Sequence, residues 1–344
     1  MTLVDLPRPD VGPGELLVRV SACGVCGTDL LKLYSPAVAK PIQLGHEVVG
    51  VVAAAGAGVA GWQVGQRLAL AHHVPCYVCH YCRHGNYSMC AAFKASNIRP
   101  GGFSEYVLAS IAHVAHTALA LPDVIPDERA VFVEPLACCV RALKRVALLP
   151  GDTALVVGAG AIGLLFLALL RQQPIQLAAL DLRPDRLDQA RAWGAALALD
   201  GADAATPARL RAATGGRGVD LAVLTVANAA TFAQALGMLR DGGTILIFGA
   251  KPGDPPATTE LWELYRREIR VISSYSSAPA DLHESLELLR RPGFALERLV
   301  THQLPLERID EGMRLARTQQ AIKVLVRPDP HPLAPSPVPT GEGE

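Results

Sequence analysis

The second half of the chain alternates between short apolar runs and segments in which apolar residues have helical spacing. The apolar run at 152–157 leads into a helix-like stretch that ends at residue 170. Strand-like runs follow at 176–181, 218–226, 242–250 and 267–275, and helix-like segments such as LDQARAWGA and TFAQALGMLR separate them. Strands that alternate with helices predict a doubly wound α/β fold around a parallel sheet.

The first part of the chain has a different pattern. Over 15–125, short pieces rich in Val and Gly, such as ELLVRV, HEVVGVVAAAG, QRLAL and FSEYVL, predict a small β-barrel. Near the end, DLHESLELLRR and IDEGMRLARTQQAIKVLV predict a helix and then a helix and a strand that return to the barrel. We therefore expect one domain made of 1–136 and 274–327 and a second domain over 137–273. The proline-rich tail, 328–344, is expected to be disordered.

Composition narrows the class of protein. Half of the 344 residues are apolar, and 32 basic side chains balance 32 acidic ones, so no net charge attracts nucleic acid or an anionic membrane. The longest apolar run is half as long as a membrane span, and the N-terminus lacks the features of a secretory signal. We predict a cytoplasmic protein without membrane or nucleic-acid partners. In that reducing compartment, its eight cysteines are ligands or core residues rather than disulfides.

Four cysteines lie close together in the loop 75–90, PCYVCHYCRHGNYSMC. Four thiolates at this spacing are typical of a tetrahedral Zn²⁺ site with no position left for water, which is a structural site. The alternatives are a set of unrelated reduced cysteines and a nucleic-acid-binding knuckle, and balanced charge argues against the knuckle. We expect structural zinc on Cys76, Cys79, Cys82 and Cys90.

A second set of possible metal ligands lies upstream. The motifs CGVCGTD and GHEVVG supply Cys26, His46 and Glu47, which are mixed sulfur, nitrogen and oxygen donors. Fewer than four protein ligands leave a position open, as in catalytic zinc sites, where a bound water or alcohol loses its proton more easily. Each motif alone is equally well explained by a core cysteine or an ordinary turn. Their occurrence with the four-cysteine loop favours a catalytic metal.

A glycine-rich motif follows the apolar run at 152–157. Gly158, Gly160 and Gly163, with Ala161 and Ile162 between the last two, form GxGxxG between a predicted strand and a predicted helix. This context predicts a dinucleotide site with the pyrophosphate at the helix N-terminus.

The residues after the next strand bear on the choice of cofactor. Asp181, about 20 residues further on, would accept from the ribose hydroxyls. Its charge repels a 2′-phosphate and so favours NAD, although Arg183 and Arg186 nearby leave NADP possible. The alternative for Asp181 is a solvated residue at the end of a strand.

Taken in order, CGVCGTD, GHEVVG, the four-cysteine loop, GGFSEYV, VEPLACCVRAL and VVGAGAIG resemble the zinc-containing medium-chain alcohol and polyol dehydrogenases, which include sorbitol- and threonine-dehydrogenase-like enzymes. The resemblance runs from about residue 6 to residue 327. It implies a GroES-like β-barrel catalytic domain, a Rossmann coenzyme domain, one catalytic and one structural zinc, and a homodimer or homotetramer.

The resemblance also implies roles for single residues. Cys26 and His46 become ligands of catalytic zinc, and either Glu47 or Glu134 is the third ligand. Asp29 is similar to the carboxylate that hydrogen-bonds a ligating histidine. Thr28 takes the place of the hydroxyl that contacts the substrate oxygen.

The sequence departs from the family at several points. Leu31 replaces a histidine that carries the substrate proton to solvent in many members, and LTVANAA at 224–230 replaces a more usual acidic, glycine-containing turn. A leading strand expected before the barrel is also missing. His113 and His116 lie on a segment that we expect to be strand-like, as surface or hydrogen-bonded histidines rather than proton carriers.

From these residues we predict a zinc-dependent oxidoreductase that transfers hydride between NAD(P) and a secondary alcohol, a polyol or an amino alcohol such as threonine. One alternative is a quinone or enone reductase of similar fold, which would use no metal. The other is a non-catalytic nucleotide-binding module that keeps only the structural zinc.

Overall fold

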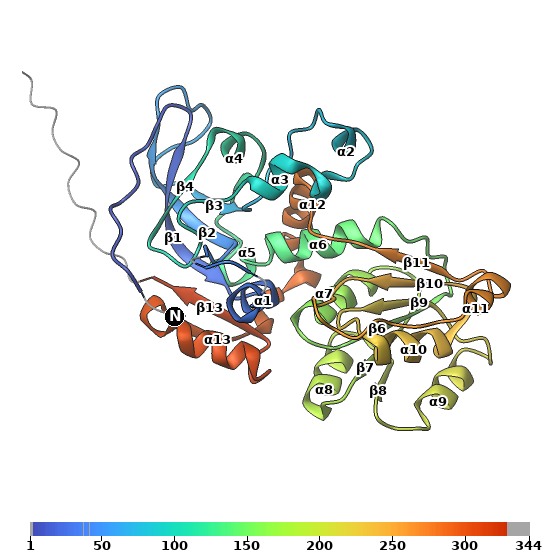
Figure 1. Cartoon of the computed structure of the whole chain (residues 1–344). Coiled ribbons are helices and arrows are strands. Elements are labelled where there is room, and N and C mark those ends of the chain that lie inside the picture. Colours follow the sequence, from blue (N-terminus) through green and yellow to red (C-terminus); the bar gives the residue numbers. More distant parts are fainter. Residues whose placement is uncertain (1–2, 37, 41, 329–344) are drawn as a thin grey trace, which may run out of the picture.

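The computed structural model describes residues 3–36, 38–40 and 42–328. These residues form two bodies side by side, each built around its own sheet (Figure 1). The predicted disordered tail, 328–344, lies outside the described residues except for Pro328. No helix among the described residues is long and apolar enough to span a membrane.

The first sheet holds strands from both ends of the chain. Its order is β12-β13-β1-β2-β3-β5, and β4 also pairs with β1. The last strand, β13, lies antiparallel to β1, with Cys23 opposite Val326. The strands are β1 (Leu16–Gly24), β2 (Glu47–Ala55), β3 (Arg67–Leu70), β4 (Tyr106–Ala109), β5 (Ala118–Ala120), β12 (Val300–Pro305) and β13 (Lys323–Arg327).

The second sheet is parallel throughout and has the order β11-β10-β9-β6-β7-β8. All five residues of β6 are buried, because helices cover both faces of a doubly wound sheet. This confirms the predicted α/β fold class. The strands are β6 (Thr153–Val157), β7 (Gln176–Asp181), β8 (Leu197–Asp200), β9 (Val219–Leu224), β10 (Leu239–Ile247) and β11 (Arg270–Ser273).

Two helices join the bodies. Nearly every residue of α6 is buried, and α6 packs against α12 beside the α/β sheet (Figure 1). Lys144, directly after α6, donates to Asp281 of α12 at 2.8 Å. The helices are α1 (Gly27–Tyr34), α2 (His80–Arg83), α3 (Ala91–Ala95), α4 (Ile111–His116), α5 (Asp127–Ala130), α6 (Val133–Leu143), α7 (Ala161–Leu170), α8 (Pro184–Ala192), α9 (Thr206–Ala213), α10 (Ala229–Met238), α11 (Leu261–Arg266), α12 (Pro279–Leu289) and α13 (Ile309–Arg317).

Local predictions differ from the structure in three places. The segment with His113 and His116 is the helix α4, not a strand, and Thr117 at its end donates its hydroxyl to Ala71 O. The cysteine loop contains the short helix α2, and the short helix α3 follows its last cysteine. The elements β8, α9, α11 and β12 were not predicted because they are short and carry weak periodicity.

Candidate active site and metal centres

The site begins where β1 ends and α1 starts. Cys26 lies just before α1, and its backbone N–H donates to Asp29 Oδ2 at 3.0 Å, which fixes the first turn. Asp29 is fully buried and also accepts from the backbone N–H of Gly45 at 3.0 Å. One carboxylate therefore ties the start of α1 to the start of β2.

The same carboxylate orients His46. Asp29 Oδ1 lies 3.3 Å from His46 Nδ1, so Nε2 is left for another partner. Burial opposes the charged form of His46, but the charge of Asp29 and its hydrogen bond raise the pKa of His46 well above its usual value. Burial likewise opposes ionisation of Asp29, yet His46 and the two backbone donors lower the pKa of Asp29. Asp29 was expected from the sequence to hydrogen-bond His46, and the two side chains lie in contact.

Cys26, His46 and Glu47 converge. Their possible ligand atoms all lie within 4.8 Å of one another, and His46 and Glu47 are buried. Glu47 Oε1 is buried without a hydrogen-bond partner in the described part of the chain. A buried carboxylate oxygen without a donor is costly unless a cation binds it. A thiolate, an imidazole and this carboxylate form a donor set that suits zinc with an open position.

Lys323 of β13 is a site residue that sequence reasoning missed. Its ammonium group forms an ion pair with Glu47 and donates to Val25 O at 3.2 Å, and the side chain is 4% exposed. Burial opposes the charge, but Glu47 and Cys26 raise the pKa of Lys323. A Cβ at position 24 would overlap Glu47 Oε2, so Gly24 makes room for the pair. No local motif marks Lys323, because its partner lies 276 positions earlier in the chain.

The other two predicted catalytic residues are Glu134 and Thr28. Glu134, on the first turn of α6, is buried, accepts from the Cys138 thiol at 3.6 Å and does not belong to the 4.8 Å group. Burial raises the pKa of Glu134. Thr28 is exposed on α1, and Leu31 is half-buried on the same helix.

The four cysteines of the loop 75–90 also lie close together, and this loop with α3 after it is called the cysteine lobe below. The thiol sulfurs of Cys76, Cys79, Cys82 and Cys90 all lie within 4.8 Å of one another, and Cys76 Sγ is 3.5 Å from Cys90 Sγ. The buried core of this lobe consists of Cys82, Cys90 and Phe93, too few residues to hold the loop by packing. The residues therefore fit a structural zinc that replaces a core.

The glycine motif makes the turn that a dinucleotide requires. Gly158 has φ +91°, where a side chain would be strained, and a Cβ there would lie 2.6 Å from Thr225 Oγ1. A Cβ at position 163 would overlap Gly158 O, so Gly163 allows α7 to pack closely on the turn. A Cβ at position 160 would meet nothing within 4 Å. That open space at the N-terminus of α7 fits a pyrophosphate. Ala161 and Ile162 are the first two residues of α7.

Asp181 lies at the end of β7 beside this turn. It accepts from the backbone N–H of Ala159 at 2.7 Å and of Arg183 at 3.0 Å. Arg183 itself is partly exposed and pairs with Asp185. Arg186 is 5% exposed and donates to the carbonyls of Gln319 and Ala321, which weighs against its predicted use for a 2′-phosphate.

The fold and these sites define a class of protein: a two-domain, nicotinamide-dependent dehydrogenase with an open metal site and a separate closed one. Two family models match the chain, the alcohol dehydrogenase GroES-like domain over residues 12–123 and the zinc-binding dehydrogenase domain over residues 161–291. The chain belongs to the zinc-containing medium-chain alcohol and polyol dehydrogenases.

Individual relatives agree with this assignment. The chain is 31% identical to a sorbitol dehydrogenase of Halalkalibacterium halodurans over 94% of each protein. It is also 31% identical to a D-altritol 5-dehydrogenase of Agrobacterium fabrum, over 88% of this chain and 89% of that protein. The solved structure of a zinc-binding dehydrogenase from Sinorhizobium meliloti 1021, bound to NADP, has a TM-score of 0.84 at 28% identity and covers 94% of both chains.

The predicted function is therefore confirmed at the level of class. The protein is a zinc-dependent oxidoreductase that transfers hydride between an alcohol or polyol and NAD(P). The two alternatives, a metal-free reductase and a non-catalytic module, are not supported, because the relatives are named dehydrogenases and both sets of metal-ligand residues are assembled.

Proposed function

We propose that Cys26, His46 and Glu47 hold the catalytic zinc and that the protein oxidises a secondary alcohol, polyol or amino alcohol with NAD. The observation that carries this proposal is the convergence of the three donors beside Asp29 and Lys323. Zinc bound there would polarise the substrate oxygen, and the nicotinamide would accept the hydride.

The protein's own side chains prepare the site for this chemistry. Asp29 contacts Nδ1 of His46, so Nε2 of the neutral ring is left free to bind the metal. Lys323 offsets the carboxylate charge of Glu47, which keeps the potential at a substrate oxygen positive and favours loss of its proton. Glu134 stays close enough for its pKa to respond to the charges of His46 and Glu47, and we propose it as an exchangeable acidic partner at the same site.

The exposed position of Thr28 also supports the proposal. Its exposed position on the first turn of α1, two residues after Cys26, suits a hydroxyl that takes a hydrogen bond from the substrate alcohol. With Leu31 in place of a proton-carrying histidine, we propose that the proton leaves directly to water at this open end.

The proposed preference for NAD depends on Asp181. Two backbone donors fix its carboxylate beside the glycine turn, where it would accept from the ribose hydroxyls and repel a 2′-phosphate. The NADP bound to the Sinorhizobium meliloti relative makes NADP the second candidate. Arg183, which is partly exposed, is the side chain that would favour it.

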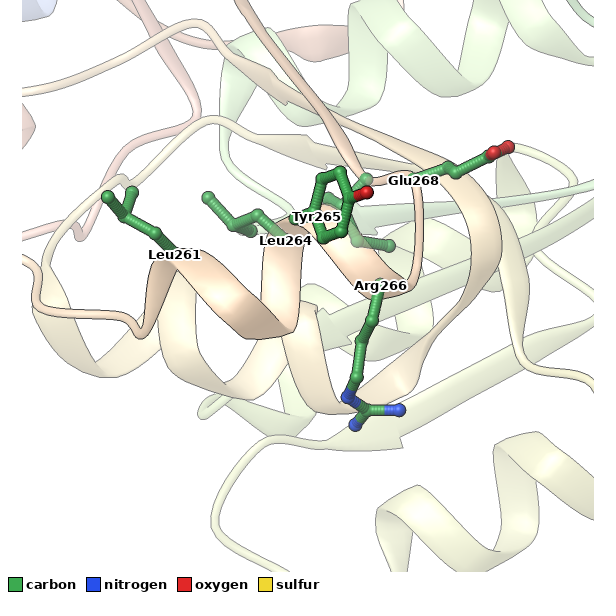
Figure 2. A pocket seen from close by; sticks show the side chains of 6 residues that line it. Leu261, Leu264, Tyr265, Arg266 and Glu268 are labelled. Carbon is green, nitrogen blue, oxygen red and sulfur yellow. The ribbon is translucent and has the colours of Figure 1, made fainter.

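We also propose that the protein is a homodimer formed through α11 and β11. The strand β11 is an edge strand of its sheet, and exposed apolar side chains lie beside it. Leu261 is 80% exposed and Tyr265 is 76% exposed. In Figure 2, Leu261, Leu264 and Tyr265 lie on one side of α11 while Arg266 points away from them. A second copy that covers this face would hide both the edge and the apolar patch.

Light scattering coupled to size exclusion tests the dimer. The wild type should have twice the molar mass of one chain. Tyr265→Asp should lower the measured mass toward that of one chain. A wild type that remains a monomer at micromolar concentration contradicts the dimer.

Eight cysteines without disulfides support our proposal that the protein works in the reducing cytoplasm.

An activity screen tests the main proposal. Zinc-loaded protein is mixed with NAD or NADP and a panel of polyols, simple alcohols and threonine, and the reduced cofactor is followed by absorbance. We expect oxidation of at least one secondary alcohol, with NAD preferred. No reduction of either cofactor across the panel, with both zincs bound, contradicts the proposed function.

A further inference from the structure

Arg186 forms hydrogen bonds between the two bodies of the molecule. It lies on α8, between β7 and β8 of the parallel sheet, yet its Nη2 donates to the carbonyl of Gln319 at 2.8 Å and to that of Ala321 at 2.7 Å. Both acceptors lie between α13 and β13 of the first body. These hydrogen bonds therefore join the domain that contains the glycine turn to the domain that contains the proposed catalytic metal site.

The acceptors belong to a well-defined turn at the end of α13. The backbone N–H of Gln319 donates to Ala316 O at 3.2 Å, and that of Gln320 donates to Leu315 O at 3.0 Å. Gln319 has φ +58°, so α13 ends in a Schellman motif with a left-handed residue directly after the helix. Because the backbone of this turn is fixed by α13, the carbonyls that Arg186 contacts move with that helix.

Each end of the contact is linked to one of the proposed binding sites. On the cofactor side, Arg186 N donates to Arg183 O at 3.1 Å, and Arg183 N donates to Asp181, the proposed ribose acceptor. On the metal side, the turn leads directly into β13, whose first residue, Lys323, pairs with Glu47. A short series of contacts therefore runs from the cofactor site to the metal site through Arg186.

The surroundings of Arg186 make this contact a reversible one. The residue is 5% exposed, and its Nη1 has no hydrogen-bond partner in the described part of the chain. Asp185 Oδ2 lies 4.0 Å from its Nε, too far for a hydrogen bond. A buried charged donor without a partner is unfavourable, and separation of the turn from α8 would admit water to it. That gain partly offsets the loss of the two hydrogen bonds.

The two bodies are also attached by apolar packing at a different place. Leu282 and Leu286 of α12 belong to the same buried cluster as Leu165 and Leu169 of α7. In Figure 1, α12 lies well apart from α8, which carries Arg186. A rotation of one body about the apolar attachment would therefore break the polar one, as in hinge motions of two-domain proteins.

We propose, on the basis of the function proposed above, that Arg186 is a latch whose hydrogen bonds to the turn before β13 hold the two domains at the separation that hydride transfer requires. These bonds break when the domains part to admit or release the cofactor and the substrate. Arg186 is thus a positioning residue, which acts through β13 and Lys323 and contacts neither the zinc nor the nicotinamide.

Substitution of Arg186 tests the latch. Arg186→Met keeps a long side chain but no donor, and it should lower kcat for a secondary alcohol about tenfold, because the closed arrangement becomes less populated. The dissociation constant of NAD, measured by calorimetry, should change less than about threefold, since Asp181 and the glycine turn lie in the same domain as Arg186. Arg186→Lys keeps a charged donor and should recover part of kcat. Arg191→Met, at an exposed position of α8, is the matched control and should change neither value.

A substrate deuterated at the reacting carbon distinguishes the latch from a purely structural role. Hydride transfer should become slower than product release in Arg186→Met, so the primary isotope effect on kcat should rise above that of the wild type. An unchanged kcat or an unchanged isotope effect overturns the inference. A loss of NAD affinity as large as the loss of kcat/KM also overturns it, because Arg186 would then be a cofactor ligand.

If Arg186→Met fails to fold, crystals of the wild type with bound NAD provide the test. The latch requires both hydrogen bonds to the carbonyls of Gln319 and Ala321 in the loaded protein. A guanidinium that turns to the cofactor, or that leaves the turn, overturns the inference. A wild type that oxidises no alcohol contradicts the proposed function instead, and the same crystals then still test the latch.

Discussion

At the scale of single residues, the site contains buried charged side chains that stabilise one another in pairs. Asp29 holds His46, and Lys323 holds Glu47, in surroundings from which water is largely excluded. Removing one partner from such a pair leaves an uncompensated buried charge, which costs more than the pair itself contributes. The ligands therefore cannot be considered apart from the residues that hold them.

Substitution of Lys323 tests this dependence. Lys323→Met should lower the free energy of unfolding of the metal-free protein by about 3–5 kcal/mol, because Glu47 would be left charged and buried. Denaturant titration measures the change. The double variant Lys323→Met with Glu47→Gln should recover much of the loss. Equal stabilities for the single variant and the wild type would show that the pair contributes nothing.

The affinity of the open site for zinc should depend on pH through His46. Asp29 raises the pKa of His46, so the metal-free site holds a proton that zinc must displace. Zinc affinity should therefore fall as the pH drops from about 8 to about 6. In Asp29→Asn the pKa of His46 should be lower, so the fall in zinc affinity should occur at lower pH. Competition with a chromophoric chelator measures both curves, and curves that coincide contradict the role of Asp29.

At the scale of elements, the two sets of metal ligands are expected to differ in function. The lobe from α2 to α3 has a core of three buried residues, whereas Cys26 follows β1, which belongs to a larger core. Metal should therefore stabilise the lobe and serve chemistry at Cys26.

Two serine substitutions separate these roles. Cys79→Ser should lower the melting temperature by several degrees and make the lobe sensitive to proteases, since the zinc replaces its core. Cys26→Ser should lower kcat/KM at least about 100-fold and change the melting temperature little. Thermal unfolding and steady-state kinetics on both variants give the comparison. If both variants only destabilise the protein, the assignment of Cys26 is wrong.

Sequence reasoning predicted the elements with strong periodicity and the motifs with short spacing. The glycine turn, the cysteine lobe and the approach of Asp29 to His46 are local or carry characteristic residues, so they could be predicted. Lys323 could not, because tertiary pairing alone brings it to the site. The hydrogen bonds of Arg186 could not be predicted for the same reason, because its partners lie more than 130 residues further along the chain.

At the scale of the whole molecule, the catalytic site depends on the return of the chain to its first sheet. The strand β13 pairs with β1 and carries Lys323 to Glu47, while α6 brings Glu134 close to His46 and Glu47. The glycine turn lies in the other body (Figure 1). In the proposed assignment, the cofactor and the catalytic metal therefore bind to different domains, and hydride transfer requires both.

The position of zinc is the most direct test of this account. Crystals of the zinc-replete protein, measured on both sides of the zinc absorption edge, should show two anomalous peaks per chain. One peak should lie among Cys76, Cys79, Cys82 and Cys90, and the other among Cys26, His46 and Glu47. A single peak in the cysteine lobe, with no ion between Cys26 and His46, would contradict the assignment of a catalytic metal to these residues.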